Sequence, residues 1–89
     1  MVFREYSLVR IRRLLRSRES YDGWRINSRP PSIGDEGTVV DVAGAQGKPD
    51  TYVYIVESSE SIEPGGSPIW LGEFSEEELE PLDGFRYTA

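Results

Sequence analysis

The side chains of this sequence that could take part in chemistry are carboxylates and arginines, since it contains neither cysteine nor histidine. Their absence removes the thiolate nucleophile, the commonest general base and the commonest transition-metal ligands. Two acidic pairs remain as candidate acid and base groups, Asp35 with Glu36 and Asp41 with Glu57. A chain of 89 residues is too small to surround such a pair with a deep pocket. We therefore predict that the protein is not an enzyme and has no catalytic residue, cofactor or metal site.

Charge is divided unevenly along the chain. Residues 1–29 contain eight arginines against three acids, a net charge of +5. Residues 30–89 contain two basic residues against thirteen acids, a net charge of −11, and the two parts together give the overall −6. Such an asymmetry bears on partners and self-association and says little about fold. Because the opposite charges can pair two copies, we expect a monomer or a weak homodimer.

Four runs rich in β-branched and aromatic residues predict strands, at residues 6–15, 38–42, 51–57 and 68–74. The run 51–57 carries apolar side chains on both faces, which is typical of a central strand. The first run fits a strand and also a helix, since Leu8, Ile11 and Leu15 have helical spacing. The β-rich remainder of the chain favours the strand, whose arginines would then line an exposed face.

The end of the chain predicts one helical turn and a last short strand. Ser75 and Glu78 have the spacing of a capping box, and Pro81 limits the helix to about one turn. A last strand would begin at Leu82. This order of elements is that of a small five-stranded all-β barrel, whose closure would remove exposed sheet edges. The expected organisation is a flexible N-terminus, one barrel domain and a flexible C-terminal tail, at residues 1–5, 6–82 and 83–89.

Several segments resemble a group of small bacterial proteins of unknown function, namely Gly34–Val42, Tyr54–Glu57, Ile69–Gly72 and Phe74–Leu82. In that group a G-D-x-G-T-V-V turn and strand precede a Y-x-V-E strand, and an acidic E-E-L turn follows. The resemblance covers residues 33–82. It implies an SH3-like barrel and nothing about activity. Together with the elements read from the residues, the expected fold is a small five-stranded SH3-like barrel with a long first loop and one short helical turn before the last strand.

A weaker similarity links the chain to the SH3-like domain of the nitrile hydratase β subunit. It rests on Val9–Arg13, Arg29–Pro31, Gly34–Val39, Pro49–Tyr52 and Trp70–Gly72. In nitrile hydratase the metal is held by a cysteine cluster on the other subunit. Because this chain lacks cysteine, the similarity implies the scaffold alone and no metal-enzyme activity.

Residues 17–33 form a long predicted loop, because they contain an Asp-Gly turn signal and a Pro-Pro pair that cannot join a central strand. In SH3-like barrels the loop after the first strand often forms one wall of a groove. Exposed aromatics there, Tyr21 and Trp24, could hold an extended or proline-rich peptide. Arg25 and Arg29 would place donors for carboxylates beside them. In the alternative interpretation, Trp24 folds back and caps the end of the barrel.

Arg10, Arg12 and Arg13 form a second candidate binding feature. Arginines at alternate positions of a strand can contact the phosphates of a nucleic acid. No aromatic residue lies between them to provide a stacking platform, and the overall charge is −6. Two further interpretations stay open: a solvated basic face partly paired with the acids of residues 76–80, and a face that binds an acidic protein.

Together these features predict a non-catalytic SH3-like barrel that acts as a protein–protein interaction module. The predicted partner-binding residues are Arg10, Arg12, Arg13, Tyr21, Trp24, Arg25 and Arg29. The alternatives are a nucleic-acid-binding barrel that uses the N-terminal arginines, and an immunity or antitoxin-like protein whose partner is a toxin. The sequence shows no signal peptide and no run of the ~20 apolar residues that cross a bilayer. We therefore expect a cytoplasmic protein that does not engage membranes.

Overall fold

The computed structural model describes residues 3–61 and 63–82 and shows an all-β protein. Five strands and two short 3-10 helices follow in the order β1 (Leu8–Ile11), η1 (Arg18–Tyr21), β2 (Glu36–Gly44), β3 (Tyr52–Ser58), β4 (Leu71–Ser75), η2 (Glu76–Glu78) and β5 (Leu79–Pro81). This confirms the predicted class and the five strands. Within the described residues, no helix is long and apolar enough to cross a membrane.

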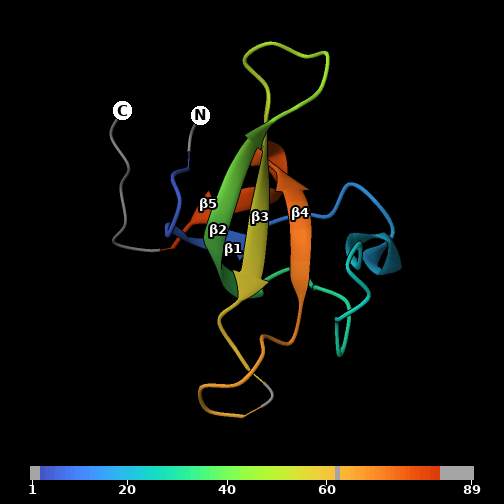
Figure 1. Cartoon of the computed structure of the whole chain (residues 1–89), viewed down its shortest axis with the longest axis vertical. Helices are drawn as coiled ribbons and strands as arrows, with labels where there is room; N and C mark the ends of the chain where they lie inside the picture. Colours follow the sequence, from blue (N-terminus) through green and yellow to red (C-terminus); the bar gives the residue numbers. More distant parts are fainter. Residues whose placement is uncertain (1–2, 62, 83–89) are drawn as a thin grey trace.

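The strands form one antiparallel sheet in the order β4-β3-β2-β1-β5. Its edges are β4 and β5, so over residues 3–61 and 63–82 the sheet is open, and the predicted closure, which would remove exposed edges, is wrong. The register of β2 with β3 shifts between Val39 and Asp41, which marks a β-bulge. A bulge bends a strand and increases its twist. The bent β2 can therefore pair with both β1 and β3 although these two strands run in different directions. In Figure 1, β1 and β5 accordingly cross behind β2, β3 and β4.

Burial shows why the first run is a strand. Val9 and Ile11 are 0% and 1% exposed, while Leu8 and Arg10, which alternate with them, are partly exposed. Alternating burial is what a strand with one face on a core requires. The strand covers only the middle of the predicted range 6–15, because the register of β1 with β2 and β5 spans these four positions.

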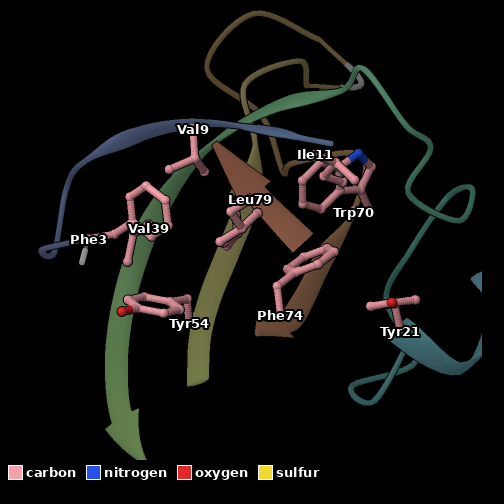
Figure 2. Packing of buried hydrophobic residues seen from close by; sticks show 10 residues of the cluster. Phe3, Val9, Ile11, Tyr21, Val39, Tyr54, Trp70, Phe74 and Leu79 are labelled. Atoms are coloured by element: carbon pink, nitrogen blue, oxygen red, sulfur yellow. The ribbon is translucent and has the colours of Figure 1, made fainter. Parts of the chain in front are cut away.

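The core lies between β1 with β5 on one side and the longer strands β2, β3 and β4 on the other. Figure 2 shows Val9 and Ile11 directed from β1 towards Tyr54 and Phe74. The buried hydrophobic residues are Phe3, Val9, Ile11, Tyr21, Val39, Tyr54, Val56, Trp70, Phe74 and Leu79. Burying each large apolar side chain contributes about 1.5–3 kcal/mol, so this cluster is the main source of stability.

Phe3 is part of this core, whereas the sequence placed it in a flexible segment at residues 1–5. Its side chain is 2% exposed, and its ring meets that of Tyr54 edge to face with 5.4 Å between the centroids. Aromatic pairs prefer this geometry. The other predicted flexible segment, residues 83–89, lies outside the described residues.

Gly37 makes room for Trp70. A Cβ atom at Gly37 would lie 2.5 Å from the carbonyl oxygen of Glu57 and 3.2 Å from the Trp70 ring. A Cβ atom at Gly72 would meet the ring of Phe74 at 3.0 Å. Each of the two large rings therefore packs on a glycine, Phe74 on one from its own strand β4 and Trp70 on one from β2.

The turn η2 confirms the predicted capping box. The amide of Ser75 donates a hydrogen bond to Glu78 Oε1 at 2.9 Å, and the serine side chain receives the amide of Glu78 in return. The last strand begins at Leu79 instead of Leu82 and includes Pro81. Because β5 is an edge strand, the missing N–H of this proline costs the sheet no hydrogen bond.

Candidate functional site

The first loop, residues 12–35, covers the outer edge of β4, as Figure 1 shows. The side-chain oxygen of Asn27 accepts a hydrogen bond from the amide of Leu71 at 2.8 Å. Arg16 Nη2 donates to the carbonyl of Glu73 at 2.7 Å. These β4 groups lie on the side away from β3, where an added strand would bind. An uncovered edge pairs readily with other chains, so the first loop protects this one.

Tyr21 anchors the first loop to the core. It is 1% exposed, and its ring stacks on that of Phe74 with centroids 4.9 Å apart. Its hydroxyl donates to the buried carboxylate of Glu78 and accepts from the amides of Leu15 and Arg16 at 3.2 and 3.3 Å. Burial, followed by the hydrogen bond to Glu78, raises the pKa of Tyr21. The prediction of Tyr21 as an exposed aromatic is therefore wrong, because its ring fills the space over Phe74.

Asp35 fixes the other end of the first loop. Its Oδ2 atom accepts hydrogen bonds from Arg29 Nη1 at 2.8 Å, the amide of Ser32 at 2.9 Å and Trp70 Nε1 at 2.9 Å. Burial raises the pKa of Asp35, but these donors outweigh it and the pKa lies below its usual value. The hydrogen bond to Asp35 in turn raises the pKa of Arg29. Arg29 therefore holds the loop in place and lies apart from its exposed tip.

Three large apolar side chains of the first loop are exposed. Leu15, Trp24 and Ile26 are 56%, 46% and 57% exposed. The interpretation in which Trp24 caps the end of the barrel does not hold, because nearly half of its surface faces solvent. Arg25 is exposed beside it, with a backbone φ of 57°. A non-glycine residue in this left-handed region belongs to a tight turn, which fits the tip of the loop.

Two shallow hollows lie on this surface. The Trp24 hollow, of about 280 Å³, is lined by Ser20, Tyr21, Gly23 and Trp24 together with Arg16 and Glu73. The Leu15 hollow, of about 340 Å³, is lined by Leu15, Val53, Phe74, Ser75 and Glu78, again with Arg16 and Glu73. Because both hollows share Arg16 and Glu73, these two residues separate them. The hollows therefore form neighbouring halves of one surface.

The β1 arginines are used differently from those of the first loop. Arg10 forms an ion pair with Glu36 at 3.6 Å, and Arg12 Nε donates to the carbonyl of Glu77 at 2.9 Å. Arg13 is exposed. The acid that pairs with Arg10 therefore lies outside residues 76–80, and Arg12 contacts the backbone of Glu77 and not its carboxylate, so neither contact is the ion pair expected with the acids of residues 76–80. None of the three lines either hollow.

Arg16, Leu15 and Glu73 are the parts of this surface that sequence analysis did not assign. Arg16 and Glu73 are 57 positions apart, and their contact depends on how the first loop folds over β4. The sequence offers one weak signal, an apolar residue, Leu15, directly before Arg16; the structure places it beyond the end of β1.

No protein-family model, curated protein or solved structure matches this chain. Within the described residues, no group of three or more acidic, histidine or cysteine side chains could hold a metal ion. The surface of the first loop combines exposed apolar area, two hollows and a fixed guanidinium. These features suit the binding of a polypeptide segment.

Proposed function

We propose that this chain is a small non-catalytic protein with an SH3-like arrangement of strands, left open between β4 and β5, and that it binds a protein partner through its first loop. The observation that carries the proposal is the 46% exposure of Trp24 beside a hollow. Exposed large apolar side chains next to hollows mark interaction sites, and tryptophan is among the residues that contribute most to binding energy.

The order of the elements supports the SH3-like part of the proposal. A long loop joins β1 and β2, a single 3-10 turn precedes β5, and β1 lies between β2 and β5. The long loop and the single turn before the last strand are features that the sequence predicted for this fold. Since one such fold serves many functions, the binding role rests on the loop surface and not on the fold.

A protein partner is favoured over a nucleic acid by the contacts of the β1 arginines. A phosphate-binding stripe needs guanidinium groups that are open to phosphates. Arg10 and Arg12 are instead bonded to Glu36 and to the backbone of Glu77. The exposed apolar surface lies elsewhere, on the first loop, and has no use in contacting phosphates.

Affinity capture from a lysate of the cells that produce the protein tests the proposal. The wild-type chain is compared with a Trp24→Ala, Arg25→Ala double variant and with Arg4→Ala as a control that keeps the first loop intact. We expect a protein that the wild type and the control recover equally and that the double variant recovers at least tenfold less. Equal recovery by all three, or recovery of nothing, would refute the proposal.

The same capture separates the other functions. Recovery that is lost on nuclease treatment would favour a nucleic-acid-binding barrel. A captured enzyme that the chain inhibits would specify an immunity or antitoxin-like role, in which the same loop surface covers the toxin.

A further inference from the structure

The face of the sheet that is turned away from the core, which we call the outer face, carries apolar side chains. Side chains alternate between the two faces of a strand, so the positions that alternate with the buried ones in β2, β3 and β4 belong to this face. The partly exposed apolar residues among them are Val40, Val53, Ile55 and Leu71. Such positions are usually polar when one face of an antiparallel sheet is solvated. In Figure 1 the outer face is turned towards the viewer, and none of the described segments crosses it.

Ile55 lies at the centre of the outer face, between two acids. It opposes Asp41 on β2 and Glu73 on β4. Directly opposite residues have Cβ atoms about 4.5–5.5 Å apart. Glu57 follows Ile55 two positions along β3, on the same face and about 7 Å away. Three carboxylates therefore surround one apolar side chain, close enough to repel one another.

The strands of the outer face supply no positive charge to balance these acids. The sequences of β2, β3 and β4 contain no lysine or arginine. Their fourth acid, Glu36, is paired with an arginine of β1. Asp41 and Glu57 form no ion pair with any residue that the structure describes. The outer face is therefore negative as well as apolar.

Two bases approach the outer face from its margins. Arg16, in the first loop, donates to the backbone carbonyl of Glu73 at the edge of β4, where its charge offsets that of Glu73. Lys48 is exposed in the loop that joins β2 and β3, four positions beyond the end of β2. Neither base belongs to the strands that carry Asp41 and Glu57. These two carboxylates consequently define the charge that a ligand meets at the centre of the sheet.

We propose that the outer face docks a basic surface of a protein partner. An apolar side chain of the partner packs on Ile55, and lysine or arginine side chains beside it pair with Asp41 and Glu57. Such a partner covers the apolar side chains and removes the mutual repulsion of the carboxylates, whereas the phosphates of a nucleic acid would be repelled. This surface is additional to the first loop and does not rest on the proposed function.

Selection from a displayed library of random peptides, with the full chain as bait, tests this ligand class. We expect enrichment of peptides that combine two or more lysines or arginines with an apolar residue. The Kd of an enriched peptide is then measured by titration calorimetry. Replacing its basic residues by glutamine should weaken binding about tenfold, because the charge pairs with the outer face are lost.

Two double variants of the protein remove the same charge from different places. Asp41→Asn with Glu57→Gln removes two acids from the outer face and should weaken binding about fivefold. The asparagine keeps an oxygen that can accept the amide of Val42, as Asp41 does at 2.9 Å. Glu63→Gln with Glu77→Gln removes two exposed acids outside β2, β3 and β4 and should leave the Kd unchanged. Thermal melting confirms that each variant is folded.

Ile55→Thr tests the apolar contact at the centre of the outer face. Threonine keeps the β-branched shape that suits a strand, but it replaces a methyl-bearing group by a hydroxyl. Because less apolar area is then covered on binding, the Kd should rise about threefold.

The outcomes separate this inference from the proposed function. Enrichment of acidic or uncharged peptides, an unenriched library, or an equal effect of the two double variants would overturn the inference. Self-association that Asp41→Asn with Glu57→Gln abolishes would also overturn it, because a second copy would then occupy the outer face. None of these results would touch the capture through Trp24, since neither Asp41 nor Glu57 lines either hollow.

Discussion

Replacing Tyr21 by phenylalanine tests whether its hydroxyl anchors the first loop. The substitution keeps the ring, and therefore the stacking on Phe74 at 4.9 Å. It removes the donor to the carboxylate of Glu78 and the acceptor of the Leu15 and Arg16 amides. Because the substitution leaves the apolar packing unchanged, any loss of stability comes from the lost polar contacts.

The magnitude follows from what each group loses. A hydrogen bond to a charged group contributes about 1.5–3 kcal/mol net, and a neutral one about 0.5–1.5 kcal/mol. Glu78 keeps the amides of Leu15 and Ser75 as donors at 3.1 and 2.9 Å, and the Leu15 amide keeps Glu78 as its acceptor. The main losses are one charged hydrogen bond and the acceptor of the Arg16 amide. We expect the free energy of unfolding to fall by about 2–3 kcal/mol.

Urea unfolding followed by the fluorescence of the buried Trp70 measures this loss. For a domain of this size, each kcal/mol corresponds to a change in Tm of about 4–8 °C, so Tm should fall by about 8–24 °C. Tyr6→Phe is the matched control, because Tyr6 is 75% exposed and its loss should cost less than about 0.5 kcal/mol. A Tyr21→Phe variant as stable as this control would refute the anchoring role. A double-mutant cycle with Glu78→Gln isolates the pairwise contribution.

Three other substitutions test further contacts. Gly37→Ala places Cβ 2.5 Å from a backbone carbonyl oxygen and should cost about 1–3 kcal/mol, whereas Gly44→Ala in the same strand meets nothing within 4 Å; urea titration compares them. Asp35 has a folded-state pKa below its usual 3.8, so its stabilisation is present above pH 3.8 and is lost as the pH falls below it. Urea unfolding at pH 7 and at pH 3 measures this loss. The difference in the free energy of unfolding between wild type and Asp35→Asn should be smaller at pH 3. Asn27→Ala should cost about 1 kcal/mol and speed hydrogen exchange of the Leu71 amide, which loses its acceptor.

The sequence predicted the elements whose signals are local. The β-branched runs gave the strands, and the Ser75–Glu78 spacing gave the capping box. Local periodicity could not decide between strand and helix for residues 6–15, because Leu8, Ile11 and Leu15 fit both. The decision came from the sheet, which buries Val9 and Ile11 on one face.

Contacts between distant segments were beyond sequence analysis. Nothing near Tyr21 in the chain indicates that its hydroxyl meets Glu78, since the two residues are 57 positions apart. Phe3 was missed for the same reason, because its partner Tyr54 belongs to another strand. The edge of the sheet at β4 was missed. Side chains of the first loop cover this edge, and the number of predicted strands says nothing about such contacts. Trp24 could be identified as a candidate from the sequence. Its exposure could not, because it depends on how Tyr21 and Asp35 fix the first loop.

The same anchors would suit a long loop to the proposed role of a binding surface. Arg18 bonds to the carbonyl of Pro31 at 3.0 Å and to Ser32 Oγ at 2.6 Å, which joins the two sides of the first loop. Tyr21 and Asp35 tie it to the core. Ordering a flexible segment on binding costs about 0.5–1.5 kcal/mol for each immobilised side chain. Because these hydrogen bonds already order the first loop in the folded protein, binding would require little further ordering. A ligand can therefore use the exposed apolar area without uncovering the edge of β4.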